Sequence, residues 1–248
     1  MELTVLGAGP AYSNRPGALG SAYLVEAAGG AIVLDLGQGT FTELALAVEP
    51  SRLSGILISH LHPDHFIDLV PLRHYLRYEL RPPGRVQVFG PGGLAERLDA
   101  LHGEPGFAAA SLDVAALEPG LFAVGPFGVE AARVAHTADS YAFRVTAPDG
   151  STGLVYSGDC GRVTDLLRLV REGDTLIVEV SFGTSPVPEG AWHLNADDIV
   201  VLARDARPGR ILLTHIQMGF DPAAVLDRVR AAFGGPVRFV TRGERLTL

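Results

Sequence analysis

The sequence lacks several residue types and patterns, and each absence narrows the class of protein. Only one cysteine, Cys160, occurs among 248 residues, which excludes a framework of intrachain disulfides. All 20 basic side chains are arginine, and we attribute the lack of lysine to the composition of the source rather than to function. No run of about 18 apolar residues occurs, so we expect no membrane-spanning segment and no membrane partner.

The first residues also lack the features of a secretion signal. Met1-Glu2-Leu3 leads directly into strand-like sequence, without a basic region followed by an apolar one. We therefore expect a cytoplasmic protein. With 248 residues, 47% of them hydrophobic and 19% charged, the chain is long enough for a large α/β domain. We expect one domain over residues 1–248.

A strongly basic surface is missing as well. The formal net charge is −8, whereas proteins that bind long nucleic acids usually carry a basic patch that neutralises phosphates. One modest cluster of arginines occurs, at Arg73, Arg77, Arg81 and Arg85. The first three are spaced by four, which we interpret as a solvated helix face. The composition favours a small anionic substrate over a long nucleic acid, and it leaves a homodimer open.

Strand and helix signals alternate along the chain. Apolar runs predict strands at residues 3–6, 21–26, 31–36, 56–59, 86–89, 176–180, 211–214 and 237–240. Amphipathic spacing predicts helices at residues 42–48, 66–72, 92–102, 163–170, 196–206 and 222–233. Residues 112–155 are rich in strand signals, and hairpin turns are expected at 27–30 and 148–150. These signals fall into two successive halves of the chain, each with consecutive strands first and alternating strands and helices later. This arrangement predicts two packed β-sheets with helices outside, a layered α/β architecture.

The chain does contain a dense group of metal-binding side chains, in His60-Leu61-His62-Pro63-Asp64-His65. This segment directly follows the apolar run 56–59, so a rigid strand end can hold it. Neutral imidazole and carboxylate are ligands that suit zinc, iron or manganese. A solvated histidine-rich turn is the alternative, but four potential ligands at this spacing favour a metal site.

The segment from Ser59 to His65 resembles the H-x-H-x-D-H signature of the metallo-β-lactamase superfamily. Later family positions match in order, at His136, Asp159 and His215. The resemblance covers essentially the whole chain and is nearest to ribonuclease Z-type phosphodiesterases. It implies a four-layer αββα sandwich of two mixed β-sheets, with a two-metal site along one edge.

The resemblance also implies a ligand set. Two divalent transition-metal ions are expected, zinc first, with manganese or iron as alternatives. One ion is expected on His60, His62 and His136, the other on Asp64, His65 and His215, with Asp159 as the bridge. Two such ions can activate a water that they share.

Two further residues have roles implied by the resemblance. His193 matches an additional histidine of the family, and we predict it as a catalytic residue beside Asp64 and Asp159. A histidine there can protonate a leaving alkoxide, although one that caps or packs under the following helix is the alternative. Asp35 matches an aspartate that braces the site, with capping of the turn 37–39 as its alternative.

Three other residues lie near or before the predicted ligands in the sequence. Cys160 follows Asp159, and we interpret it as a buried apolar residue rather than a ligand. Asn14 and Arg15 lie in a loop rich in glycine and proline, where they either contact substrate or belong to an ordinary surface loop.

Departures from enzymes that mature tRNA limit the expected function. Those enzymes typically carry glycine where this chain has Asp68, and they project a long clamping arm between the third-motif histidine and the bridging aspartate. Here His136 and Asp159 are only 23 positions apart. We expect a phosphodiesterase that attacks a small or short phosphodiester with a metal-bridging hydroxide. A lactonase, thioesterase or carboxylic ester hydrolase is the alternative, and a redox or binding protein is less favoured.

Overall fold

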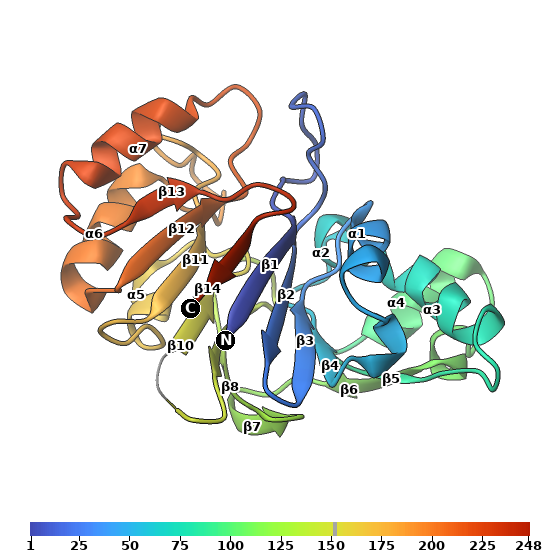
Figure 1. Cartoon of the computed structure of the whole chain (residues 1–248). Coiled ribbons are helices and arrows are strands. Elements are labelled where there is room, and N and C mark those ends of the chain that lie inside the picture. The colour runs from blue at the N-terminus through green and yellow to red at the C-terminus, as the bar shows by residue number, and fades with distance from the viewer. Residues whose placement is uncertain (151–152) are drawn as a thin grey trace.

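Two β-sheets of seven strands each pack face to face, and helices cover the outer face of each sheet (Figure 1). The structure is a computed structural model, and it describes residues 1–150 and 153–248. Both sheets contain parallel and antiparallel pairs. The four-layer αββα sandwich predicted from the sequence is therefore confirmed.

The first sheet has the strand order β14-β1-β2-β3-β4-β5-β6. Its strands are β1 (Glu2–Gly7), β2 (Ala22–Ala27), β3 (Gly30–Leu34), β4 (Gly55–Leu57), β5 (Val86–Gly90), β6 (Leu112–Ala116) and β14 (Arg245–Thr247). The helices of this half are α1 (Thr40–Ala47), α2 (Pro63–Phe66), α3 (Leu69–Tyr78) and α4 (Leu94–His102). Short 3₁₀ turns occupy Pro50–Arg52 and Ala108–Ala110.

The second sheet has the strand order β13-β12-β11-β10-β9-β8-β7. Its strands are β7 (Gly120–Val124), β8 (Phe127–Arg133), β9 (Tyr141–Thr146), β10 (Gly153–Tyr156), β11 (Thr175–Glu179), β12 (Arg210–Thr214) and β13 (Val237–Phe239). Helices α5 (Val163–Leu167), α6 (Ala196–Ala206) and α7 (Pro222–Arg230) pack on it. The predicted hairpins, β2–β3 and β9–β10, are both antiparallel pairs.

The apolar strands are buried on both faces because each sheet lies between two layers. In β3, Ile32 and Leu34 join the core between the sheets, whereas Val33 packs in the core under the helices. This alternation follows from the two-residue period of a strand. It explains why the central strands read as continuous apolar runs rather than as alternating ones.

Strand direction brings the polar candidates to one edge of the sandwich. In the first sheet β3 and β4 are parallel, and in the second sheet β10, β11 and β12 are parallel. β8 runs in the same direction as β10 because both are antiparallel to β9. The residues that follow these strand ends are Asp35, His60, His136, Asp159 and His215.

Three details differ from the expectations. The helix predicted over 66–72 is split into α2 and α3, because Pro71 has no N–H to donate to the carbonyl of residue 67. The arginines do not form a solvated face: Arg73 is buried and donates to the Phe107 carbonyl at 2.8 Å, and Arg81 lies beyond the end of α3. Strand β14 was not expected. Within the described residues, every helix falls short of the length and apolarity needed to cross a membrane.

Candidate metal centre

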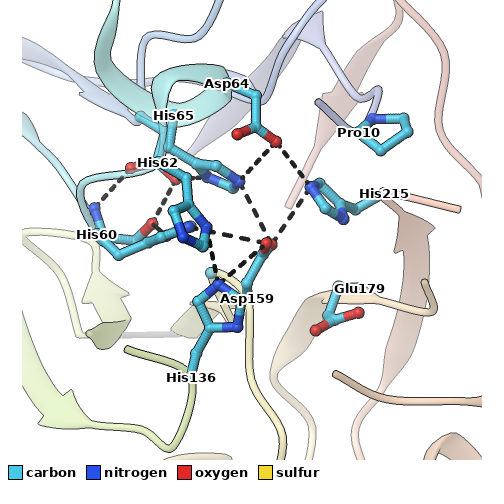
Figure 2. Close-up of polar contacts among 12 residues, drawn as sticks. Pro10, His60, His62, Asp64, His65, His136, Asp159, Glu179 and His215 are labelled. Carbon is cyan, nitrogen blue, oxygen red and sulfur yellow. Dashed lines mark hydrogen bonds and ion pairs between the residues drawn. The ribbon is translucent and has the colours of Figure 1, made fainter. Parts of the chain in front are cut away.

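The turn between β4 and α3 carries four of the predicted ligands. Asp64 and His65 lie in helix α2, which begins at Pro63, where the missing N–H of proline costs no hydrogen bond. His62 is the residue before the helix, and its carbonyl accepts from the His65 N–H at 3.0 Å. His60, Asp64 and His65 are buried, whereas His62 is exposed. This tight turn directs the three histidines and the carboxylate toward one point (Figure 2).

All seven predicted ligands come together. One group contains His60, His62, His136 and Asp159, and its donor atoms lie within 4.8 Å of one another. A second group, held to the same limit, contains Asp64, His65 and His215. These groups match the two sets expected from the sequence, although their roles as ligands stay a prediction.

Asp159 lies between the two groups and presents one carboxylate oxygen to each. Its Oδ2 is 3.8 Å from His60 Nε2 and 3.7 Å from His136 Nε2. Its Oδ1 is 3.4 Å from His65 Nε2 and 3.5 Å from His215 Nε2. This is the geometry of a carboxylate that can bridge two cations.

Three buried nitrogen or oxygen atoms of the cluster have no hydrogen-bond partner among the described residues: His60 Nε2, His65 Nε2 and Asp159 Oδ1. An unsatisfied buried polar atom costs about 1–3 kcal/mol, and more when charged. A divalent cation at each of the two groups would satisfy all three. The residues present therefore fit a metal centre.

The electrostatics of the cluster supports the same conclusion. Burial lowers the pKa of His60 well below its usual value, and it also lowers the pKa of His136, which favours neutral imidazoles with a free lone pair. Burial raises the pKa of Asp159, but the neighbouring His215, His65 and His60 outweigh this effect and hold that pKa well below the usual range. His60 and His136 therefore offer neutral imidazole, and Asp159 offers an ionised carboxylate, the forms that bind metals. His65 differs: burial lowers its pKa, but the carboxylates of Asp159 and Asp35 outweigh this effect and raise that pKa well above its usual value.

Asp35 braces His65 rather than capping the turn at 37–39. It follows β3 with a φ of 57°, and its Oδ2 accepts from His65 Nδ1 at 2.7 Å. It also accepts from the Ser59 N–H at 2.6 Å and from the Tyr156 hydroxyl at 2.6 Å. Because Nδ1 of His65 is held in this way, its Nε2 points into the cluster.

The other histidines are oriented through their second nitrogen too. His136 Nδ1 lies 2.7 Å from the Trp192 carbonyl, and His215 Nδ1 lies 3.0 Å from the Ser181 hydroxyl. His215 has a φ of 56°, and its backbone N–H donates to the Ala8 carbonyl at 3.1 Å. These bonds fix the rings before any metal binds, which reduces the ordering that binding requires.

His193 lies against the cluster rather than acting as a helix cap. The N-cap of α6 is Asn195, whose side chain accepts from the N–H groups of Asp197 and Asp198. His193 Nδ1 is 2.8 Å from Glu179 Oε1 and 3.9 Å from Asp159 Oδ2. Burial lowers the pKa of His193, but the charge and hydrogen bond of Glu179 outweigh it and raise the pKa to about 9.

Sequence reasoning missed Glu179 as a residue of the site. It is fully buried at the end of β11, and it accepts from the Cys160 N–H at 2.9 Å and the Ser181 N–H at 3.0 Å as well as from His193. The available signal was a carboxylate that ends the apolar run 176–179, because an acidic side chain is rarely buried there without a partner.

The remaining candidates lie outside the cluster. Cys160 is buried, as expected, and its thiol donates to the Arg162 carbonyl at 3.3 Å. Asn14 is exposed, whereas Arg15 donates to the carbonyl of Ile216 at 2.9 Å and to that of Phe220 at 3.0 Å. Arg15 therefore fastens its loop to the segment that follows His215.

Comparison with known proteins agrees with this geometry. Residues 32–216 match the family described as beta-lactamase superfamily domain. A protein of Mycobacterium leprae (strain TN) is 33% identical over 251 residues, covering 98% of this chain and 87% of that protein. Ribonuclease Z of Pyrobaculum arsenaticum is 26% identical over 272 residues, covering 90% of this chain and 89% of that protein.

A solved structure has the same fold. The metallo-beta-lactamase fold protein YhfI from Bacillus subtilis superposes with a TM-score of 0.87 at 23% identity, over 99% of both chains. The family match includes the ligand-bearing turn and the strand ends that supply the other predicted ligands. The chain therefore belongs to the β-lactamase superfamily and is a metallo-hydrolase that resembles ribonuclease Z.

Proposed function

We propose that the protein is a two-metal-dependent phosphodiesterase that acts on a small or short phosphodiester, with zinc as its metal. The observation that carries this proposal is the pair of His193 and Glu179 beside Asp159. Hydrolysis of a phosphodiester releases an alkoxide, which needs a proton when it is a poor leaving group. A histidine held by a buried carboxylate at the edge of the metal cluster is suited to supply it.

The predicted ligands form two groups, one for each metal ion, and Asp159 lies between them. His60, His62 and His136 would hold one ion, and Asp64, His65 and His215 the other. Asp159 would hold both, through its two oxygens. When bound, two divalent ions lower the pKa of a shared water and neutralise charge that develops on the phosphate.

His193 is oriented to use one particular nitrogen. Its Nδ1 is occupied by Glu179 Oε1, so Nε2 is the nitrogen left to carry the transferable proton. Glu179 is in turn fixed by the backbone N–H groups of Cys160 and Ser181. The buried carboxylate favours the protonated imidazole, which is the form required of a general acid.

The net charge and the short segment between His136 and Asp159 support a small substrate. The net charge of −8 disfavours a long polyanion, which gains much of its affinity from basic surface. His136 and Asp159 are separated by 23 positions, and the β9–β10 hairpin lies between them. The similarity to ribonuclease Z supports phosphodiester chemistry, and a compact connection at this place supports a substrate other than tRNA.

The test is a hydrolysis screen with zinc-loaded protein against bis(4-nitrophenyl) phosphate, a lactone and a thioester. We expect about two metal ions per chain by elemental analysis, and hydrolysis of the phosphodiester. Hydrolysis of the lactone or thioester alone would assign the site to carbonyl substrates. Failure to take up metal after chelation and reloading would overturn the proposal.

A further inference from the structure

A cavity of about 470 Å³ adjoins the metal-binding cluster at His215. Its walls come from the loop 8–19, from residues 214–216 at the end of β12 and from residues 239–242 at the end of β13. Pro10 and His215 both line it, and Figure 2 shows Pro10 on the side of the cluster where His215 lies. The cavity is thus continuous with the cluster through a predicted metal ligand.

The walls combine apolar surface with positive charge. Leu19, Ile216 and Phe239 supply apolar side chains, and Arg15 and Arg242 supply guanidinium groups. Across residues 1–150 and 153–248, no aspartate or glutamate lines the cavity, although the whole chain has a net charge of −8. This local reversal of charge suits an organic group that is attached to an anion.

The two arginines are placed differently. Arg15 is bound by backbone carbonyls at 216 and 220, and it forms no ion pair with a carboxylate in the described part of the chain, so its charge is uncompensated. Arg242 is exposed and lies 3.5 Å from Glu43 Oε1, a weak ion pair. Arg15 therefore shapes the wall, and Arg242 remains available to a ligand at the mouth.

We infer that this cavity binds the organic substituent of the substrate, a ring-bearing group of nucleoside size, while the phosphate lies at the metal-binding cluster. The inference rests on the phosphodiesterase activity proposed above. The volume of the cavity lies within the range of about 300–1,000 Å³ that is usual for small-molecule sites. Apolar walls cover the rings, and the cationic side chains complement the negative charge next to them.

The test compares two substrates that release the same 4-nitrophenolate: thymidine 5′-(4-nitrophenyl phosphate) and methyl 4-nitrophenyl phosphate. The ratio of their kcat/KM values then reports only the recognition of thymidine against methyl. Two variants perturb the cavity, Ala18→Trp by filling its mouth and Arg242→Ala by removing the cation. Matched controls make the same changes at exposed positions outside it, Ala28→Trp and Arg245→Ala.

We expect the wild-type protein to prefer the thymidine ester, and both cavity variants to lower the ratio by about tenfold or more. The controls should keep the wild-type ratio. Equal ratios in the wild type and the cavity variants, with both esters hydrolysed, would overturn the cavity assignment and leave the phosphodiesterase standing.

Direct binding separates failure of the inference from failure of the proposed activity. If neither ester is hydrolysed, the phosphodiesterase proposal fails, and calorimetric titration with thymidine 5′-monophosphate decides on the cavity. Binding that Ala18→Trp abolishes and Ala28→Trp keeps would support an organic anion in the cavity. Absence of binding to the wild-type protein would overturn that assignment as well.

Discussion

The two sheets supply the metal-binding cluster in different ways. The first sheet contributes His60, His62, Asp64 and His65 from six consecutive residues in one turn. The second sheet contributes His136, Asp159 and His215 from three separate strand ends. The first set is organised by local backbone geometry, whereas the second depends on strand pairing across the sheet.

This difference locates the weak point of the site. Within the turn, Pro63 and the His65 N–H bond to the His62 carbonyl hold the ligands together locally. In the second sheet, Asp159 and His215 are aligned only because β10, β11 and β12 lie in parallel register. Asp159 faces both groups, so the two halves of the site meet at its carboxylate.

The largest expected effect therefore follows from Asp159→Ala. Turnover of bis(4-nitrophenyl) phosphate should fall at least about 10³-fold, since both ions lose a ligand. His62→Ala should also abolish hydrolysis, but it removes a ligand from one group only. Elemental analysis should then find less metal in Asp159→Ala than in His62→Ala. Near wild-type turnover in either folded variant would place the active site elsewhere.

The next effect concerns His193, which lies outside the two ligand groups expected from the sequence. His193→Ala should lower kcat by about 10²–10⁴-fold on phosphodiesters with an alkoxide leaving group, and by less when the leaving group is 4-nitrophenolate. His102→Ala, at a partly exposed histidine in α4, is the matched control. Metal content should be unchanged.

Two results would contradict the assigned role of His193. An equal loss for good and poor leaving groups would indicate positioning rather than proton transfer. A loss of metal would make His193 a ligand, an arrangement that its position near Asp159 and His215 allows.

A smaller loss of metal affinity should follow from a change at Asp35, which accepts hydrogen bonds from His65 and Ser59 of the ligand-bearing turn. Asp35→Asn removes one of the two carboxylate oxygens that hold His65 and Ser59, so metal affinity should fall about 10–100-fold. Competition with a coloured chelator measures this affinity. Asp113→Asn, at an exposed carboxylate paired with Arg85, serves as control. Wild-type affinity in Asp35→Asn would show that the turn orients His65 without help.

The smallest effect is expected on stability. Metal that binds only the folded state adds about 4 kcal/mol when free metal exceeds Kd a thousandfold, so chelation should lower Tm by roughly 10 °C. Asp159→Ala should show a smaller shift on chelation, because it holds less metal. Differential scanning calorimetry with and without chelator tests both. An equal shift in both proteins would mean that Asp159 is dispensable for metal binding.

Much of this fold was accessible from residue patterns. Runs such as 31–36 and 211–214 predicted strands because buried strands between two layers are apolar on both faces. The helix at 196–206 was located correctly, since Asn195 caps its first turn. The break between α2 and α3 was missed, although Pro71 marks it, because the amphipathic pattern continues across the break.

The predictability of the site differs between the ligands of the first sheet and those of the second. The spacing in residues 60–65 predicted a metal-binding cluster, because one turn brings these side chains together. The order of the later residues identified His136, Asp159 and His215 only through family resemblance. Their proximity is a property of strand pairing, which local sequence does not encode.

Only the tertiary structure decided which groups surround the ligands. Glu179 and His193 are 14 positions apart, and they meet because the chain after β11 folds back over the strand end. The cavity beside His215 likewise needs the loop 8–19 to lie against residues that follow β12 and β13. Sequence alone determined the chemistry of the ligands, since that depends on residue type. Contacts between distant segments determined the surroundings of His193 and the shape of the cavity beside His215, because burial and charge there come from chain packing.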